Sequence, residues 1–428
     1  MKIVEYRVTP IAFGDPPVRA AMGLHAPYAL RTIIELVADD GTTGISETHG
    51  GAAVVEDLNK VTDLVIGRDP FRLAELEHQI CGDQQNSSAN TPFWEGRLHS
   101  SPRTFGAIEV ACLDMIGKAT NRSVGDLLGG HVRERVDFSA YLFYKHHGAG
   151  GPYGFADDPN AVDGWPLARQ QQALNAEELV AQALAMTKAF GFASLKLKAG
   201  VLEPEEEIRT IRLLRDAYGP ATPLRIDPNT AWSLETSMAC AKPLEGLLEY
   251  YEDPVAGKAE MAMLAKQTSL PLATNMCCVS FADLPATIQL GSVQIILGDH
   301  HFWGGLRASV QLARICQTWK IGLSMHSNSH LGISLAAMTH LAAAVPNLTY
   351  ACDTHYPWQA EEIIVGGKLN FEHGSLAVPN EPGLGVTLDH SELARMHQQY
   401  VDCGLTVRDD QFEMQKIEPG WQARFPRW

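Results

Sequence analysis

The chain has 428 residues, of which 45% are hydrophobic and 20% charged, and its formal net charge at pH 7 is -16. This length and composition predict a soluble globular protein of two or three units with a large buried core. The acidic balance disfavours binding to nucleic acid or anionic membranes, because both require a basic face that replaces counterions. A small anionic substrate remains compatible, since a pocket can hold local lysines and a metal cation.

No stretch approaches the run of about eighteen uncharged apolar residues that crosses a bilayer, and the opening MKIVEYRVTP has no apolar leader core. The 8 cysteines are scattered and form no CxxC pair, which favours reduced thiols over disulfides or a zinc site. We therefore expect a cytoplasmic protein with no membrane partner.

The amino-terminal part predicts a separate α+β domain over residues 1–130. Residues 31–48 alternate apolar and polar side chains on either side of an Asp-Gly turn, which is typical of an antiparallel hairpin. Residues 105–118 have helical spacing that brings Ile108, Ala111 and Met115 onto one face.

From about residue 135 the pattern becomes strand, loop, helix, strand. Asn175 with Glu178 predicts a helix start and Gly191 its end, and the short strand ASLKLK follows. Pro204 then predicts the first turn of another helix, which Gly219 ends before the strand PLRID. Two such units in succession indicate a parallel β/α barrel, which we assign to residues 131–384.

Two further segments complete the predicted organisation. Residues 146–168 are rich in Gly, Pro and Asp without periodicity, so we expect a long loop on the catalytic rim after the first barrel strand. Residues 385–428 show helical spacing in SELARMHQQY and end in WQARFPRW, which we expect to pack back on the amino-terminal domain.

Polar residues recur in the second half at intervals of 23 to 29 residues, about the length of one strand plus one returning helix. Each closes a short apolar run, so each is expected at the carboxyl end of a strand, where barrels of this kind carry their chemistry. The six residues of this series are Lys198, Asp227, Glu252, Asn275, Asp299 and His326.

The strand SLKLK places Lys196 and Lys198 on the same face, because side chains alternate along a strand. A strand with one solvated face is the simpler explanation of such a pair. A parallel barrel strand is covered on both faces, however, so we expect both ammonium groups inside the barrel. Burial and mutual repulsion are then expected to lower their pKa values toward that of a usable base.

Asp227, Glu252 and Asn275 end three successive strands and would converge as oxygen ligands of a hard divalent cation such as Mg²⁺. Each residue taken alone could instead cap the next helix. Three matching strand ends that face the lysines favour the metal site. The neutral Asn275 leaves two negative charges among the ligands, which balances the cation and lets a dianionic substrate approach.

His326 and Asp299 occupy the next two places in the series. The carboxylate could bond one imidazole nitrogen and leave the other free as a base, although such a pair is often only structural. A cation, a basic Lys198 and an opposed His326 suit removal of a proton next to a carboxylate. Lys196 would stabilise the resulting enediolate electrostatically.

These residues resemble the enolase superfamily, and within it the glucarate dehydratase group, over nearly the whole chain. Asn as the third ligand together with HSN after the seventh strand is specific to that group. The matching motifs are KLK, DPN, YEDP, ATNM, GDHHFW and the segment HSNSHLGISLAAMTHLAAA that begins at His326.

The resemblance implies a (β/α)7β barrel of the TIM type with an α+β capping domain built from the amino-terminal region and the carboxyl-terminal tail. It also implies Mg²⁺ as the cofactor. The residues that it implies as substrate contacts are His25, Thr104, Tyr144, Asn229, Asn328 and Arg424, with Arg427 an equal candidate to Arg424 because the tail departs from the family pattern.

The implied reaction is dehydration of an aldarate such as glucarate or idarate to a 4-deoxy-5-keto product. Lys198 would serve one C5 epimer and His326 the other. Two alternatives remain open: a racemase, epimerase or dehydratase of another acid sugar on the same site, and a catalytically silent homologue that binds acid sugars. A small acid sugar is thus the expected partner, and a homo-oligomer is also expected.

Overall fold

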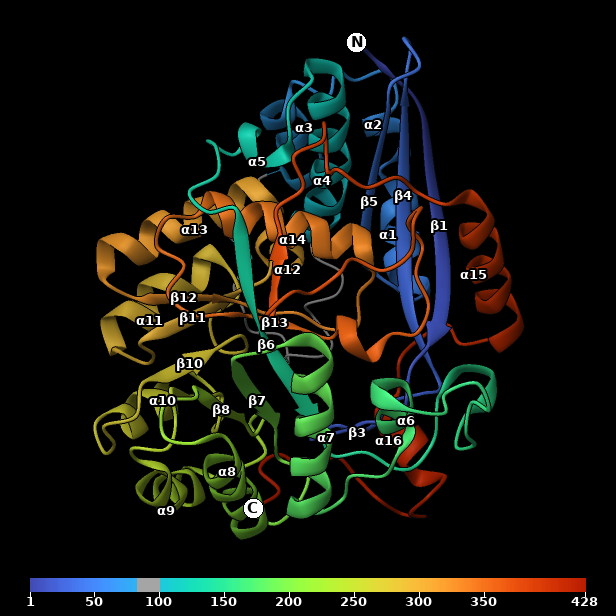
Figure 1. The fold of residues 1–428 in the computed structure, drawn as a ribbon. Coiled ribbons are helices and arrows are strands. Elements are labelled where there is room, and N and C mark those ends of the chain that lie inside the picture. Colours follow the sequence, from blue (N-terminus) through green and yellow to red (C-terminus); the bar gives the residue numbers. More distant parts are fainter. Residues whose placement is uncertain (83–100) are drawn as a thin grey trace.

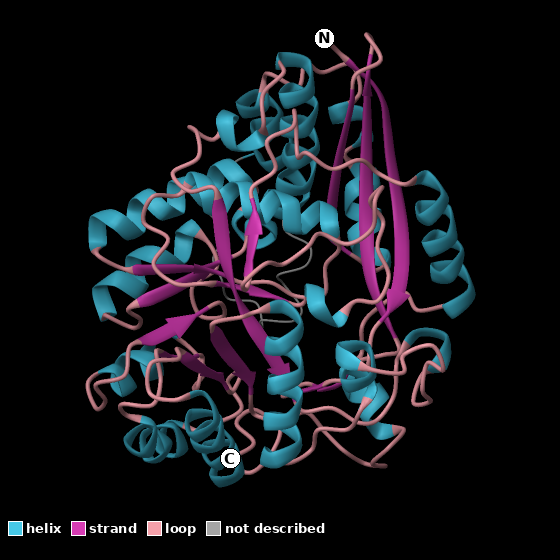
Figure 2. Ribbon diagram, in the orientation of Figure 1, coloured by secondary structure: helices cyan, strands magenta, loops and turns pink. Residues whose placement is uncertain are grey.

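The structure, a computed structural model, describes residues 1–82 and 101–428. An antiparallel sheet and its helices lie beside a parallel β/α barrel, with the long helices α4 and α14 between the two (Figure 1). Figure 2 shows the same arrangement by element type, with the three long strands of the sheet at the upper right and the barrel strands at the lower left. The predicted combination of a TIM-type barrel with an α+β capping domain is confirmed.

The capping sheet has the strand order β1-β4-β5 and consists of β1 (Ile3–Gly14), β4 (Tyr28–Ala38) and β5 (Thr43–His49). The predicted hairpin is confirmed, since β4 and β5 pair antiparallel with Val37 opposite Thr43 across the Asp-Gly turn. A small pair, β2 (Arg19–Ala20) and β3 (Gly23–Leu24), lies in the chain between β1 and β4. The helices of this part are α1 (Ala52–Lys60), α2 (Thr62–Val65), α3 (Leu73–Cys81), α4 (Ser101–Thr120) and α5 (Val124–Leu127).

Helix α4 differs from the one-sided helix that its spacing predicts, because every residue from Arg103 to Gly117 is buried. One face contacts the capping sheet: Ser46 Oγ donates to the Ala107 carbonyl at 2.6 Å. The other face contacts the barrel, where Glu109 Oε2 accepts from the Leu306 N–H at 2.6 Å. The helix is therefore the central layer between the capping sheet and the barrel.

The barrel sheet runs in the order β12-β11-β10-β9-β8-β7-β6-β13, all parallel. Its two end strands approach each other, and Ser324 Oγ donates to the Ala351 carbonyl at 2.9 Å. Strand β14 (Ser375–Ala377) adds antiparallel to β6. The barrel strands are β6 (Arg135–Phe143), β7 (Ser194–Lys198), β8 (Leu224–Asp227), β9 (Tyr250–Glu252), β10 (Leu272–Thr274), β11 (Ile295–Gly298), β12 (Gly322–Met325) and β13 (Cys352–Thr354).

Seven helical connections join these eight strands, as the (β/α)7β description requires. The helices are α6 (Gly164–Gln170), α7 (Ala176–Phe190), α8 (Pro204–Tyr218), α9 (Leu234–Leu244), α10 (Lys258–Ala265), α11 (Leu284–Leu290), α12 (His300–Trp303), α13 (Leu306–Trp319) and α14 (Gly332–Ala344). All residues of α14 are buried, because the helix lies between the barrel and the capping sheet.

The helix signals in the sequence act as predicted, with one difference in detail. Asn175 Oδ1 accepts from the Glu178 N–H at 2.9 Å, and Gly191 ends α7 in the left-handed conformation at φ 75°. The Glu178 carboxylate, however, accepts from the Leu174 N–H at 2.8 Å, one residue before the expected partner. Helix α8 begins at Pro204 and ends before Gly219, as predicted.

The segment after β6 is more ordered than its composition predicts, because α6 begins at Gly164 within it. At the carboxyl end, α15 (His390–Cys403) packs on β1 as predicted, with Gln399 Nε2 donating to the Ala12 carbonyl at 2.8 Å. Helix α16 (Asp410–Gln415) follows. The final residues contact the amino-terminal part as predicted, with Arg427 Nη2 donating to the Ala21 carbonyl at 2.7 Å, and they also contact a barrel loop, where the Arg427 N–H donates to the Ala231 carbonyl at 2.7 Å. The domain boundaries at 130 and 384 stay predictions.

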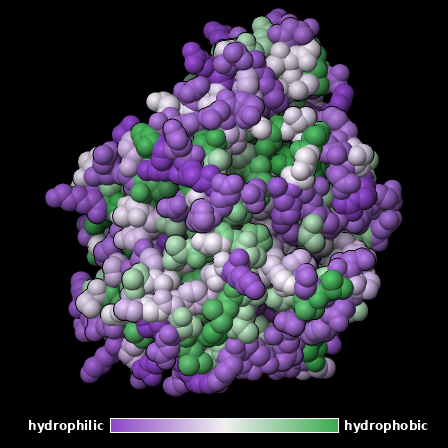
Figure 3. All heavy atoms as spheres, viewed as in Figure 1, coloured by the Kyte–Doolittle hydropathy of each residue, from purple (hydrophilic) through white to green (hydrophobic). Residues whose placement is uncertain are grey.

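Polar residues cover most of the face shown in Figure 3, and apolar residues form separate patches on it. Within residues 1–82 and 101–428, no helix has the length and apolarity that a bilayer span requires.

Candidate active site

The six residues of the predicted series all lie at the carboxyl ends of barrel strands. Lys198, Asp227 and Glu252 are the last residues of β7, β8 and β9, and Asn275, Asp299 and His326 directly follow β10, β11 and β12. All are buried except His326, which is partly exposed. Parallel strands thus bring residues that are far apart in the sequence to one edge of the barrel.

Lys196 is enclosed by carboxylates. Its Nζ lies 2.6 Å from Glu252 Oε2, 2.7 Å from Asp353 Oδ2 and 4.8 Å from the centre of the Tyr141 ring. Burial lowers the pKa of Lys196, but the negative charges of Asp353 and Glu252 raise it by more, so its pKa lies well above the ordinary value. The expectation of a lowered pKa is therefore wrong for Lys196, which stays a cation.

Lys198 lies at the open end of the same strand. Its Nζ is 2.6 Å from Asp227 Oδ2 and also donates to Asn229 Oδ1. The backbone N–H of Asn229 donates to Asp227 Oδ1 at 3.0 Å, which fixes the turn after β8. The predicted position of Lys198 beside the acidic cluster agrees with the structure, and Asn229 lies beside Asp227.

The buried oxygens of Asp227, Glu252 and Asn275 fit a hard divalent cation. Asn275 Nδ2 donates to Glu252 Oε1 at 3.1 Å, and Glu252 Oε2 has no hydrogen-bond donor among the described residues, although Lys196 forms an ion pair with it. Burial raises the pKa of Glu252 well above its usual value despite that lysine. Two adjacent buried carboxylates and an amide are the donor set that Mg²⁺ prefers.

His326 forms the predicted pair with Asp299. Its Nδ1 lies 2.9 Å from Asp299 Oδ2, while Asp299 Oδ1 accepts from both Nδ1 and the backbone N–H of His301, at 2.8 and 2.9 Å. Burial raises the pKa of Asp299, but His301 and His326 lower it by more, to well below its usual range. The carboxylate is therefore charged and orients two imidazoles.

Asp299, His300 and His301 also bring ligand atoms within 4.8 Å of one another. The guanidinium of Arg31 lies beside them, with Nη2 3.2 Å from His301 Nε2. This fixed positive charge opposes a second cation, so we assign no metal to this group.

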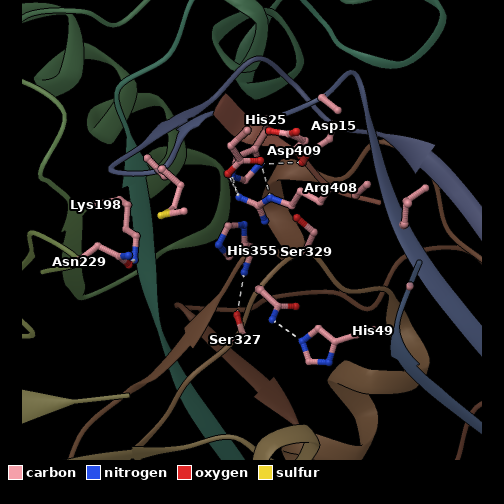
Figure 4. A pocket seen from close by; sticks show the side chains of 18 of the residues that line it. Asp15, His25, His49, Lys198, Asn229, Ser327, Ser329, His355, Arg408 and Asp409 are labelled. Atoms are coloured by element: carbon pink, nitrogen blue, oxygen red, sulfur yellow. Dashed lines mark hydrogen bonds and ion pairs between the residues drawn. The ribbon is translucent and has the colours of Figure 1, made fainter. Parts of the chain in front are cut away.

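A cavity of about 730 Å³ opens above these residues, between the barrel and the capping part. Figure 4 shows Lys198 and Asn229 on one side of it and His49 on another. Asp227 and Glu252 are not among the residues that line the cavity. Because Lys198 lines it and contacts Asp227 at 2.6 Å, the proposed metal ligands lie behind Lys198, at the cavity floor. The predicted residues that line the cavity are His25, Lys198, Asn229, His326 and Asn328.

His25 belongs to a polar group with Asp15 and Arg408 in the upper part of Figure 4, where Lys198 lies to the left of the group and His49 below it. Its Nδ1 donates to Asp15 Oδ2 at 2.8 Å, and its Nε2 accepts from Arg408 Nη2 at 2.6 Å. Arg408 also pairs with Asp410 at 2.6 Å and keeps half of its side chain exposed. Arg408 is an arginine of the carboxyl-terminal segment that lines the cavity, and the sequence reasoning did not name it.

Four other predicted substrate contacts do not line the cavity. Thr104 is buried in α4, whereas its neighbour Arg103 lines the cavity with its guanidinium 4.5 Å from the centre of the Phe302 ring. Tyr144 donates to or accepts from Thr210 Oγ1 at 2.8 Å on the helix side of β6, because side chains alternate along the chain there.

The two tail arginines are also placed elsewhere. Arg424 is exposed and bonds only weakly to Gln422 at 3.4 Å, while its neighbours Ala423 and Phe425 line the cavity. Arg427 Nη1 donates to the Gly200 carbonyl at 3.2 Å and contributes no side chain to the cavity.

Sequence reasoning also missed Asp353, His355 and Tyr141. Asp353 on β13 pairs with Lys196, and its position 27 residues after His326 continues the interval of the series, so the signal was present. Tyr141 and His355 line the cavity with their rings 4.8 Å apart. The alternation of β6 indicates Tyr141 once that strand is recognised.

The fold and the site define a class: a parallel barrel with a capping sheet, acid and base groups at the strand ends, and a buried oxygen set that suits a cation. Residues 178–392 match the family model described as enolase C-terminal domain-like. The chain belongs to the enolase superfamily of enzymes.

Relatives with the same overall length support this assignment. A protein from Streptomyces coelicolor named probable glucarate dehydratase is 44% identical over 445 residues, which covers 100% of this chain and 99% of that protein. A solved enolase from Mycobacterium smegmatis complexed with tartrate has a TM-score of 0.90 and 48% identity, with coverage of 100% and 98%. Another from Pseudomonas fluorescens, with bound magnesium, potassium and tartrate, has a TM-score of 0.91 and 47% identity, with coverage of 100% and 99%.

Proposed function

We propose that the protein is a Mg²⁺-dependent dehydratase of an acid sugar, with a glucarate-like aldarate as its substrate. The observation that carries the proposal is that Lys198 and His326, at the carboxyl ends of β7 and β12, line one cavity above a buried oxygen set. The similarity to a probable glucarate dehydratase supports the substrate class. The magnesium in the related Pseudomonas fluorescens structure supports the cation.

Asp227, Glu252 and Asn275 would hold the cation. When bound, Mg²⁺ supplies positive charge that polarises the substrate carboxylate and so acidifies the neighbouring C–H bond. Every proton transfer falls to residues of the chain.

The reaction begins with removal of the proton at C5. Lys198 Nζ accepts it from one C5 epimer, and His326 Nε2 accepts it from the other. The electron pair of the broken C–H bond moves into the carboxylate as an enediolate, which the ammonium of Lys196 stabilises. Because Lys196 is held as a cation by Asp353 and Glu252, it acts by its charge and not as a base.

Elimination completes the reaction. The C4–O bond breaks as the enediolate electrons form the C4–C5 double bond, and the leaving hydroxyl takes a proton from His326 Nε2–H and departs as water. Where His326 is the base this is the proton removed from C5, and where Lys198 is the base His326 begins the reaction protonated on both ring nitrogens. The resulting enol takes up a proton at C4 and becomes the 4-deoxy-5-keto acid. His326 thus has a role for both epimers.

The polar group around His25 would receive the second carboxylate. Arg408 lies beside His25 in the cavity lining and takes the place first given to Arg424. Asn229 and Asn328 line the part of the cavity near the two bases and would bind the sugar hydroxyls. An aldarate therefore finds a basic group at each end.

Two bases in one cavity also suit epimerisation at C5, which is the runner-up activity. Incubating the protein with Mg²⁺ and a panel of diacid and monoacid sugars in deuterated water separates the candidates. A keto product from glucarate or idarate supports the proposal, and exchange without loss of water indicates an epimerase. A rise in melting temperature with glucarate but neither exchange nor product indicates a silent binding protein.

A further inference from the structure

A buried ion pair of the capping hairpin reaches the catalytic edge of the barrel. Arg31 Nε on β4 donates to Glu47 Oε1 on β5 at 2.9 Å, and the two side chains are 1% and 0% exposed. The Glu47 oxygens also accept from the backbone N–H groups of Leu331 at 2.8 Å and Ser334 at 2.9 Å. The ion pair is thus anchored to the start of α14, and the Arg31 guanidinium has a fixed place.

The remaining nitrogens of Arg31 contact two barrel residues. Nη1 donates to Asn328 Oδ1 at 3.2 Å, and Nη2 lies 3.2 Å from His301 Nε2. On its other side Asn328 Nδ2 donates to His49 Nε2 at 2.7 Å. The amide of Asn328 is therefore oriented from both ends by residues of the capping hairpin.

The contacts of His301 determine where its proton lies. Its Nδ1 faces Asp299 Oδ1 at 2.8 Å, and because a carboxylate only accepts, Nδ1 carries the proton. A guanidinium only donates, so Nε2 accepts from Arg31. The Glu47 carbonyl and Ser334 Oγ also lie 3.2 and 3.3 Å from Nε2, and a neutral ring with its proton on Nδ1 can accept there from the hydroxyl as well as from Arg31.

The proton on His301 has a consequence for the base. Asp299 Oδ1 is occupied by the side chain and the backbone N–H of His301, which leaves Oδ2 for His326 Nδ1 at 2.9 Å. In its neutral form His326 therefore carries its proton on Nδ1, and Nε2 has the lone pair that a general base needs.

The neighbouring imidazoles do not compete for this proton. Burial, and next the positive charge of Arg31, lower the pKa of His49 and of His330 well below the ordinary value. Burial has the same effect on His300 and His355. Lys198, in contrast, bonds to Asp227 and Asn229 within the barrel, and among residues 1–82 and 101–428 it has no hydrogen bond or ion pair with the capping hairpin.

We infer that Arg31 and His301 are positioning residues for the general base His326, through which the capping hairpin controls one of the two proton transfers. Arg31 fixes the proton of His301, His301 orients Asp299, and Asp299 presents the lone pair of His326. The inference rests on the proposed function, since it requires two bases that serve opposite C5 epimers. Proton removal from the C5 epimer served by His326 should therefore depend on the capping hairpin. Proton removal from the epimer served by Lys198 should not.

The first test uses Arg31→Lys, which keeps the charge opposite Glu47 and so avoids a buried unpaired carboxylate. Exchange of the C5 proton with deuterated solvent is measured for both epimers with Mg²⁺, after Lys198→Met and His326→Asn have assigned each epimer to its base. We expect the ratio of the His326-dependent rate to the Lys198-dependent rate to fall on the order of tenfold or more, because any loss of substrate binding through Asn328 acts on both epimers while the loss of base orientation acts on one. Arg169→Lys is the matched control, because Arg169 is buried and bonds to the carbonyls of Trp358 and Ala149, away from this network.

The second test compares two amides at position 301. In His301→Asn the amide N–H takes the place of Nδ1 and can still donate to Asp299, whereas in His301→Gln the amide lies nearer the place of Nε2. His301→Asn should therefore keep more of the His326-dependent exchange than His301→Gln. This comparison decides the matter if Arg31→Lys does not fold.

The outcomes separate the two proposals. Suppose that the wild-type enzyme exchanges the C5 proton of both epimers. If the ratio of the His326-dependent to the Lys198-dependent rate is then the same in Arg31→Lys as in Arg169→Lys, the positioning role is wrong and the proposed function stands. The same conclusion follows if the two His301 variants do not differ in His326-dependent exchange. If the wild-type enzyme exchanges neither epimer of any acid sugar tested, the proposed function is wrong and the positioning role is wrong with it.

Discussion

Glu207 offers a test of how the catalytic strand β7 is held. This residue lies in the first turns of α8, and its carboxylate accepts from the backbone N–H groups of Gly200, Val201 and Leu202 at 2.9, 2.8 and 3.0 Å. These residues form the loop that follows Lys198. Burial raises the pKa of Glu207 from 4.5 to about 7, although the three hydrogen bonds oppose the rise.

The direction of the resulting pH dependence follows from proton binding. The folded protein binds the Glu207 proton more tightly than the unfolded chain does, because the pKa of Glu207 is higher in the folded state. The protonated carboxyl therefore contributes its full stabilisation below about pH 4.5, and this stabilisation is lost as the pH rises through about 7. A rise of about 2.5 in pKa corresponds to about 3 kcal/mol, and most of it falls between about pH 5 and pH 8.

Glu207→Gln removes this titration and keeps one amide oxygen in place for the Val201 and Leu202 N–H groups. Urea unfolding of both proteins from pH 5 to pH 8 measures the effect as the difference between their free energies of unfolding. The wild-type protein should lose about 2 to 3 kcal/mol more than the variant over this range. Other titrations, such as that of Glu109, whose pKa burial also raises to about 7, occur in both proteins and cancel in the difference. Parallel pH curves for the two proteins would refute the reasoning.

Three further predictions concern the chemistry. Lys198→Met should abolish reaction of one C5 epimer and leave exchange of the C5 proton in the other. His326→Asn should remove elimination more completely, because His326 also protonates the leaving hydroxyl. Equal residual activity of both variants, measured by proton NMR, would contradict the two-base assignment. Asn275→Asp adds a third negative charge to the ligand set and should lower kcat/KM for a dianionic substrate by about tenfold or more, which corresponds to about 1.4 kcal/mol, so a rise in kcat/KM would overturn the charge argument. Treatment with EDTA should abolish formation of the keto product and added Mg²⁺ should restore it; full activity after chelation would exclude the proposed cofactor role.

The barrel and the floor of the site could be predicted from the sequence because both depend on local patterns. A strand end is marked by the few residues around it, and parallel topology then brings successive ends together without further information. This reasoning located Asp227 and Glu252 at the carboxyl ends of their strands.

The contacts from the capping part could not be predicted in the same way. They depend on how segments hundreds of residues apart in the chain approach each other, as with Arg408 and His25. Local alternation, had it been followed along β6, would have indicated Tyr141 in place of Tyr144. The expected pKa of Lys196 was wrong because Asp353, which continues the interval of the series, was left out of it, and its carboxylate on β13 pairs with Lys196. Cytoplasmic location and homo-oligomer formation remain predictions.

Helix α4 meets the loop between α12 and α13 backbone to backbone. A methyl group added to Gly106 would lie 2.5 Å from the Gly305 nitrogen and 2.6 Å from the Gly304 carbonyl carbon. Even alanine at this position would therefore push α4 away from the loop between α12 and α13. Arg31 and His49 reach Asn328 from the same capping part. A screen for lost catalysis would therefore select Gly106 substitutions alongside those of the acid and base groups, although this glycine touches no reactant and its effect would be purely steric.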